Sequence, residues 1–399
     1  MTAAARLQPR QARLAVVGIG ILAVTAAGFV RAPLLPDMGR ALALSDTALG
    51  AIVSCFAFGR ILADIPAGRL TDRVPSGLMM ATGAALVGAG SVVSGLAPGP
   101  AAAFAGAFVL GIGSAWTNTT GLATFAAAPR HRRGVSMSGF AASLMVGQAF
   151  GPTLGGAVAS VYDWRAGFLS GAFVAVAVAL VFLVFFRHSP PRHPATAAQD
   201  PLGDAGEPRR LVLASLYLLP AAQFAIGASL LQTLIPIVGD GELDLTPGVI
   251  GLAIGGGGLA RLVGVLVSGK ISDTHSRRWA LIPGLAIQLV GLIVFALNGS
   301  LVGWMITILL TSLGSSAVNV GATVLADLSE GSKLGRRLGL FRVTGDVALL
   351  IAPLVAGALY DSAGRAVAMV PLIVFVAVIL GFSMRVVPET LQRGPSRPT

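Results

Sequence analysis

The sequence of 399 residues is poor in charge and in cysteine. Its 28 Lys and Arg and 17 Asp and Glu residues make up 11% of the chain, against about 25% in a typical soluble domain. A soluble globule of this length needs far more polar surface to cover its core. A soluble enzyme and a disordered chain are therefore excluded. The single cysteine, Cys55, excludes a framework of intrachain disulfides.

Motifs of nucleotide, metal and catalytic sites are also missing from the sequence. The four histidines, at 131, 188, 193 and 275, lack the spacing of metal ligands. No G-x-x-x-x-G-K-S/T loop occurs, so we expect neither a nucleotide partner nor ATP-driven transport. No clustered His, Asp, Glu or Ser site suggests an embedded enzyme. We therefore predict a protein that is not an enzyme and that carries no cofactor and no metal.

Long apolar segments dominate the chain, with 55% hydrophobic residues and a mean hydropathy of +0.82. Several exceed the roughly 18 residues typical of a membrane-spanning helix. Lipid offers no hydrogen-bond partners to the backbone, so a single span has to satisfy its own N–H and C=O groups by forming a helix. The fold class predicted is all-α and integral to the membrane, with twelve transmembrane helices. Their expected ranges are 14–36, 48–69, 77–97, 101–128, 135–160, 166–186, 211–238, 248–269, 279–298, 301–326, 338–359 and 366–386.

The net charge of +11 reflects membrane topology. Of the 28 basic residues, 21 fall in loops and tails on one side of the predicted helices and three on the other, with four inside helices. The positive-inside rule then places both termini in the cytoplasm of a multi-pass protein in the cell (inner) membrane. No basic stripe with interleaved aromatics indicates a nucleic-acid partner.

The segment 187–210 differs from the rest because it is polar and contains five prolines. This composition is typical of a linker. We therefore predict five regions along the chain. They are a cytoplasmic tail at 1–13, a six-helix half at 14–186, the cytoplasmic linker at 187–210, a second six-helix half at 211–386 and a cytoplasmic tail at 387–399.

The two halves repeat each other at a constant offset of 201 residues. Arg60 matches Arg261 and Asn118 matches Asn319, and many glycines and prolines between positions 50 and 156 match residues of the second half. Because six helices is an even number, both halves enter the membrane in the same direction. They are parallel repeats related by an axis along the membrane normal.

The loop G-R-L-T-D-R at 68–73 and its copy G-K-I-S-D at 269–273 resemble the signature of the major facilitator superfamily. The resemblance covers essentially the whole chain and implies transport by alternating access. It also implies that the signature residues hold the cytoplasmic gate. The residues carried over to this gate are Gly68, Asp72, Arg73, Gly269, Asp273, Arg277 and Arg278.

The fifth predicted helix contains glycines at four-residue spacing, similar to the antiporter motif of the drug:proton branch of that family. Small residues let helix backbones approach closely in lipid. The resemblance suggests that this face packs against a helix of the other half and seals a leak path; plain close packing is the alternative. The motif comprises Gly147, Gly151, Pro152, Gly155 and Gly156.

Charged residues inside the predicted helices are candidates for function, because burial of charge in a bilayer is costly. Arg60 and Asp64 lie four residues apart, as do Arg342 and Asp346, so each pair can form an ion pair on one helix face. The two acids are the candidate proton carriers, with static ion pairs as the alternative. Arg261 has no acid at four-residue spacing and requires another partner or an anionic ligand.

In the resembled fold, helices 1, 4, 7 and 10 line the central cavity. Arg31 lies near the outer end of helix 1, where it contacts either an anionic substrate or the acids at 37, 240, 242 and 244. Asn118 and Asn319 either face substrate or bond helices to each other. The candidate cavity residues are Thr25, Arg31, Trp116, Asn118, Gln223, Gln232, Arg261 and Asn319.

These patterns favour proton-coupled efflux of a small amphipathic or hydrophobic compound by a monomer. The alternative within transport is uptake or facilitated movement of a small organic anion, which Arg31 and Arg261 would suit. Outside transport, the alternative is a membrane sensor or interaction protein.

Overall fold

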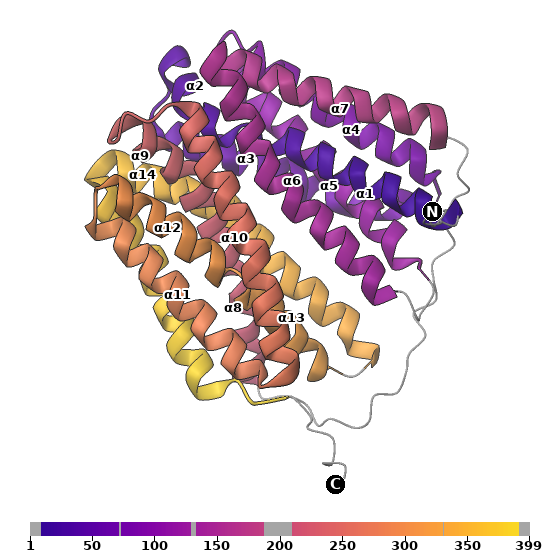
Figure 1. Cartoon of the computed structure of the whole chain (residues 1–399), viewed down its shortest axis with the longest axis vertical. Helices are drawn as coiled ribbons and strands as arrows, with labels where there is room; N and C mark the ends of the chain where they lie inside the picture. The colour runs from indigo at the N-terminus through magenta and orange to yellow at the C-terminus, as the bar shows by residue number, and fades with distance from the viewer. Residues whose placement is uncertain (1–8, 72, 129–132, 187–209, 330, 391–399) are drawn as a thin grey trace, which may run out of the picture. The chain divides into compact units, whose positions relative to one another are not determined.

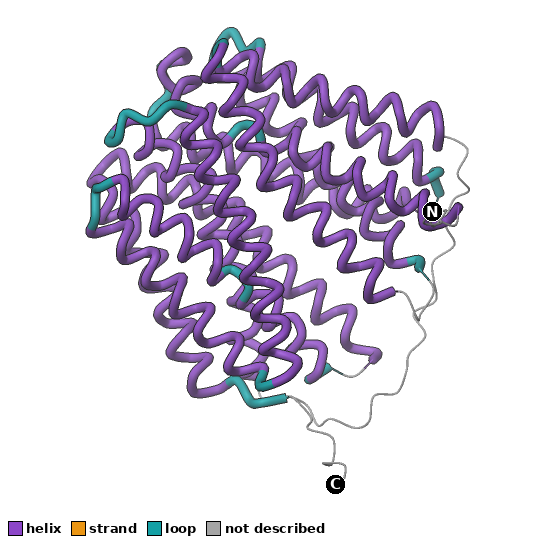
Figure 2. Tube along the Cα trace, in the orientation of Figure 1, coloured by secondary structure: helices purple, strands orange, loops and turns teal. Residues whose placement is uncertain are grey.

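The computed structural model describes residues 9–71, 73–128, 133–186, 210–329 and 331–390. Throughout these residues the chain is helical, with short connecting loops and no strand (Figures 1 and 2). The first half contains α1 (Pro9–Phe29), η1 (Ala32–Leu34), α2 (Leu35–Leu42), α3 (Asp46–Thr71), α4 (Ser76–Gly95), α5 (Pro100–Ala126), α6 (Arg133–Val161) and α7 (Trp164–Phe186). The second half contains α8 (Arg210–Ala225), η3 (Ile226–Leu234), α9 (Ile235–Gly241), α10 (Pro247–Thr274), α11 (Arg277–Leu297), α12 (Leu301–Gly314), α13 (Ala317–Asp327) and α14 (Gly331–Val386). The predicted linker 187–210 lies outside the described residues except for Arg210, which begins α8.

Among the described residues, eleven helices are long and apolar enough to cross a bilayer. The last of them, Arg337–Val386, has 50 residues and a helical length of about 75 Å at 1.5 Å per residue. This is more than twice the roughly 30 Å of a hydrocarbon core. Gly364, with φ of 77°, interrupts the helical geometry and divides α14 into two crossings. The protein is therefore an all-helical, multi-pass membrane protein.

Two of the predicted helices are broken in the structure. The first breaks around Val30–Arg31, just before Pro33 and Pro36, which fix φ and remove two backbone donors. The segment 301–326 divides into α12 and α13 at Ser315 and Ser316. Their hydroxyls bond the carbonyls of Ser312 and Leu313 and so compete with the helix.

The contacts divide the chain into two compact units. Unit 1 comprises 1–44, 55–196 and 245–255, and unit 2 comprises 45–54, 197–244 and 256–399. In unit 1, α4 packs against α5 and α7, and α1 packs against α6 (Figure 1). In unit 2, α14 packs against α8 and α11, and α11 packs against α12. The first residues of α3 thus pack in unit 2, and the first residues of α10 pack in unit 1.

Candidate functional site

The beginnings of α3 and α10 make equivalent close contacts. A Cβ on Gly50 of α3 would overlap the carbonyl oxygen of Pro353 in α14, within unit 2. A Cβ on Gly251 of α10 would overlap the carbonyl oxygen of Pro152 in α6, within unit 1. Each pair is related to the other by the offset of 201 residues. In both contacts, the absence of a side chain on glycine lets one helix touch the backbone of the other.

The same two helix starts are capped by side chains from the helices that they touch. The Asp361 carboxylate accepts hydrogen bonds from the backbone N–H groups of Asp46, at 3.1 Å, and Thr47, at 2.7 Å. At the equivalent place, the Ser160 hydroxyl accepts from the N–H of Gly248 at 2.8 Å. These caps satisfy donors that the first turn of a helix leaves unpaired. Sequence reasoning missed both, although the offset of 201 relates them.

The glycines of α6 divide between two neighbours. Gly147, Gly151 and Gly155 lie against the carbonyls of Leu22 and Ala26 in α1 and of Val30, which directly follows α1. The prediction that this face packs against the other half is wrong for these three glycines, because α1 belongs to the same half. Residues four apart share one helix face.

The next residue along α6 faces a different helix, because each residue turns the helix by about 100°. Pro152 contacts Gly251, and a Cβ on Gly156 would overlap the carbonyl oxygen of Pro247. Both partners begin α10. Only this part of the motif contacts a helix of the second half.

Among the described residues, two acids, Asp64 and Asp346, lie well inside membrane-spanning helices and away from the helix ends. Asp346 of α14 is 8% exposed, and its Oδ2 lies 3.8 Å from Nε of Arg342, as the four-residue spacing predicts. Asp64 of α3 accepts a hydrogen bond from the Thr119 hydroxyl of α5 at 3.1 Å. Thr119 was not predicted, although a hydroxyl next to Asn118 in a cavity-lining helix was a usable signal.

Arg31 is the most deeply buried cation among the described residues, at 1% exposed. Its guanidinium donates to the Gly28 carbonyl at 3.3 Å and lies 3.8 Å from the ring centre of Phe56. The ring face is electronegative and attracts the cation. Arg60 is close enough to act on Arg31 electrostatically, and like charges repel. Two arginines of the first half therefore lie near each other, one on α3 and one just after α1.

Two of the acids proposed as partners for Arg31 have other partners. Asp37 forms an ion pair with Arg40, and Glu242 lies 3.2 Å from Arg365.

Arg261, the other cation predicted to line the cavity, is partly buried in α10.

The second copy of the signature, at 269–273, lies at the C-terminal end of α10 and belongs to a network of charged residues. Arg277 bonds Asp273 at 2.5 Å and Asp327 at 3.2 Å. The Glu389 carboxylate accepts from the backbone N–H groups of Arg277, at 3.0 Å, and Arg278, at 3.3 Å, which caps α11. Arg278 also donates to the Met384 carbonyl. The chain after α14 thus holds the loop between α10 and α11.

The first signature copy is described in part. Asp72 lies outside the described residues, and Arg73 is exposed. Among the described residues, a Cβ on Gly68 or on Gly269 would meet no atom within 4 Å, so no close approach to this part of the chain requires glycine at either position.

Asn118 and Asn319 do not bond helices to each other. Asn118 is half-buried and Asn319 is exposed, and within the described residues neither side-chain amide makes a hydrogen bond. Their donors and acceptors are therefore available to a ligand or water.

The other predicted cavity residues of the first half are held by nearby helices. Trp116 donates its indole N–H to the Met79 sulfur of α4 at 3.1 Å, which directs it into its own half. Thr25 of α1 is partly buried beside Gly147.

The helix with Gln223 and Gln232 contains a nine-residue π-helix, η3, which begins after Gln223 and includes Gln232. π-Helical segments are rare and are frequent at functional sites. In an uninterrupted α-helix, residues nine apart lie on opposite faces. A π-helix has more residues per turn than an α-helix, so η3 rotates Gln232 away from the face opposite Gln223. The sequence predicted one regular helix here.

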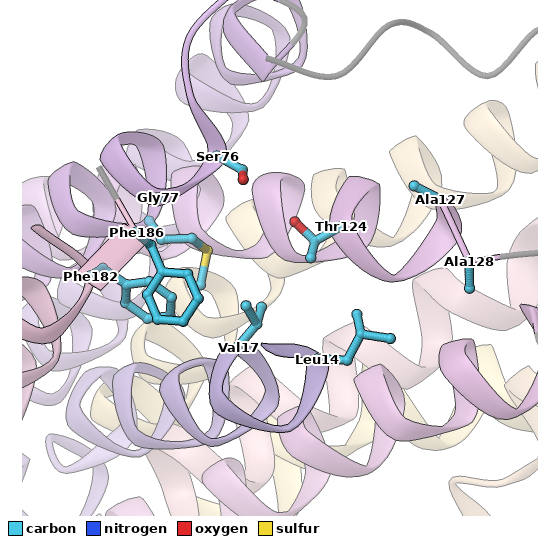
Figure 3. Close-up of a pocket in the computed structure, with 10 residues that line it drawn as sticks. Leu14, Val17, Ser76, Gly77, Thr124, Ala127, Ala128, Phe182 and Phe186 are labelled. Atoms are coloured by element: carbon cyan, nitrogen blue, oxygen red, sulfur yellow. The ribbon is translucent and has the colours of Figure 1, made fainter. Parts of the chain in front are cut away.

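A small cavity of about 210 Å³ lies in unit 1 at the ends of α1, α4, α5 and α7. Figure 3 shows Leu14 and Val17 on one side and Ser76 and Thr124 on another. Phe182 also lines it and belongs to the apolar core of the unit. The cavity thus adjoins the start of α4, just after the first signature loop.

Many apolar crossings, few charges and two repeated halves define the chain as a multi-pass membrane transporter. The family model of the Major Facilitator Superfamily matches residues 17–246 and 221–398. The chain therefore belongs to the major facilitator superfamily, whose members transport by alternating access.

Solved structures share the fold at low sequence identity. A bacterial homolog of the human lysosomal transporter Spinster, inward-facing and occupied, has a TM-score of 0.77 at 15% identity, covering 96% of this chain and 97% of that one. The xylose transporter XylE from E. coli, inward open, has a TM-score of 0.76 at 15% identity, covering 95% and 96%. The peptide transporter POT in complex with sulfate has a TM-score of 0.73 at 16% identity, covering 94% of each chain. No curated protein matches the chain. These likenesses establish the fold and leave the substrate open.

Proposed function

We propose that the protein exports a small amphipathic or hydrophobic compound in exchange for protons. The observation that carries this proposal is the pair of membrane-embedded acids, Asp64 and Asp346. A carboxylate in the bilayer is costly and marks proton pathways in transporters. Asp346 is 8% exposed and 3.8 Å from Arg342, so a proton that neutralises it removes a direct attraction between two charged groups.

Alternating access requires that protonation favours one conformation over the other. Loss of the Asp346–Arg342 attraction changes the relative free energies of any two states that differ in this pair. Asp64 has an equivalent role if its bond to Thr119 forms in only one state. Either acid then couples proton binding to the conformational change.

The proposed arrangement places both termini and the signature loops in the cytoplasm of a monomer in the cell membrane. Asp72 and Asp273 belong to the cytoplasmic gate, together with Arg73, Arg277 and Arg278.

The second candidate function is transport of a small organic anion. The burial of Arg31 at 1% exposed, with Arg60 acting on it electrostatically, favours this alternative. An anionic substrate group would offset the repulsion between the two cations.

Flux driven by a pH gradient in proteoliposomes tests these alternatives. The probes are ethidium, a lipophilic cation, chloramphenicol, a neutral amphipathic compound, and benzoate, an organic anion. The variants are Asp64→Asn and Asp346→Asn, with Asp163→Asn as the matched control. Asp163 caps α7 through the N–H of Ala166, and Asn caps helices as well as Asp does.

Proton-coupled efflux of ethidium or chloramphenicol that falls at least about tenfold in one membrane variant, but not in the control, would support the proposal. A tenfold loss corresponds to about 1.4 kcal/mol. Benzoate flux that is independent of the gradient and survives both substitutions would refute it and favour the anion alternative.

A further inference from the structure

Gln288 is a buried polar residue in the middle of α11, a helix that was not predicted to line the substrate cavity. It is 1% exposed and cannot itself reach a substrate. Its Nε2 donates to Oε1 of Gln223 in α8 at 2.8 Å and to the carbonyl of Thr311 in α12 at 3.3 Å. All three residues belong to unit 2.

The Thr311 carbonyl determines how both amides are oriented. A carbonyl oxygen can only accept, so the Gln288 atom that faces it must be the nitrogen. The same nitrogen faces Gln223, so the Gln223 atom there must be an acceptor, which is its oxygen. The Gln223 nitrogen, with its two hydrogens, therefore points away from Gln288.

That nitrogen is available to a ligand. Within the described residues it makes no hydrogen bond, and it is not among the side-chain atoms shut off from solvent. Gln223 is 8% exposed and lies three residues before the start of η3. The side chain is thus almost fully buried, and its nitrogen keeps some contact with solvent-accessible space.

Close packing holds Gln288 in place. Cβ atoms on Gly314 and Gly291 would lie 2.5 Å from Cγ of Gln288 and 2.9 Å from Cγ2 of Thr311. A larger residue at 314 would displace Gln288, and one at 291 would displace Thr311. The orientation of Gln223 is therefore built into the interface between α11 and α12.

We propose that Gln288 is a positioning residue for substrate specificity: it orients Gln223 to donate a hydrogen bond to an oxygen acceptor of the transported compound. Carbonyl, nitro, hydroxyl and carboxylate oxygens belong to this class of acceptor. The inference rests on the export function proposed above and adds a specificity for oxygen-bearing compounds. If Gln288 is lost, the Gln223 amide rotates and the donor is presented only part of the time.

The test measures KM and maximal rate of transport for chloramphenicol, which bears carbonyl and nitro oxygens, and for ethidium, which has no oxygen acceptor. We expect Gln288→Met to raise the KM for chloramphenicol about 2- to 10-fold, the range of a typical hydrogen bond. Its maximal rate and the KM for ethidium should change less than twofold. In a Gln223→Met background, Gln288→Met should have no further effect on the KM for chloramphenicol.

Gln288→Asn is a milder second variant, because the shorter amide cannot reach both acceptors. It should reproduce the selective change in KM if Gln288→Met lowers the yield of folded protein. An equal change in KM for both probes, or an additive effect in the double variant, would overturn the inference while leaving export intact. If the unsubstituted protein transports neither probe, the export function fails and the inference fails with it.

Discussion

Gly151 lies where α6 closely approaches α1, so its substitution by alanine tests the helix packing directly. A Cβ at this position would overlap the carbonyl oxygen of Ala26 and lie 2.8 Å from Cβ of Phe29. Carbon atoms in contact normally lie about 3.5–4.0 Å apart. The two helices would therefore have to separate locally by about 0.7–1.2 Å.

A separation of this size is costly because it affects the whole interface. A gap of about 0.5–1 Å already loses a quarter to a half of the dispersion attraction across it, and overpacking of a close-packed interior costs about 1–3 kcal/mol. We expect Gly151→Ala to lower the free energy of unfolding by that amount. Gly147→Ala should behave similarly, because its Cβ would lie 2.5 Å from the Leu22 carbonyl oxygen.

The matched control is Gly139→Ala in the same helix. A Cβ there would lie 3.7 Å from the Phe125 ring, which is an ordinary contact. Replacing a glycine inside a helix by alanine gains about 0.5–1 kcal/mol. The two substitutions should thus change stability in opposite directions, as measured by reversible unfolding of the purified protein in detergent. Equal stabilities of the two variants would refute the packing argument.

Two further substitutions test the caps at the ends of the helices. Asp361→Ala removes the acceptor for the first turn of α3, so it should cost about 0.5–2 kcal/mol of cap energy and increase alkylation of Cys55 in the same helix several-fold. Asp361→Ser copies the cap of the other repeat and should retain part of the effect; equal alkylation of Cys55 in the unsubstituted and Ala proteins would contradict this role. Glu389→Ala should lower the free energy of unfolding by about 1 kcal/mol, whereas Glu389→Gln keeps an acceptor for α11 and should lose less. An unaltered melting curve for Glu389→Ala would show that the C-terminal segment does not stabilise α11.

Much of the fold could be predicted because the bilayer restricts the options. Apolar length identified the crossings, and the offset of 201 residues identified the repeat. The ion pair of Arg342 with Asp346 followed from spacing within one helix. In contrast, the breaks around Val30–Arg31 and at 315–316, and the π-helix at 226–234, depend on local competition for backbone hydrogen bonds, which hydropathy does not register.

The partners of the candidate site residues were less predictable. Thr119 lies 55 residues from Asp64 and Gln288 lies 65 residues from Gln223, so no local pattern connects them. The glycines of α6 were correctly expected to allow close approach, but their spacing could not say which helix approaches.

By itself, the sequence determined the all-helical membrane fold, the number of crossings and the family, because these depend on apolar length, an internal repeat and short motifs. The tertiary structure decided which side chains meet. It placed three glycines of α6 against α1 and brought the Asp361 carboxylate to the first turn of α3, which it caps. It also oriented the Gln223 side chain so that its amide nitrogen points away from Gln288. Each of these contacts depends on the distance and angle between helices far apart in the chain, and that information arises only when the helices pack.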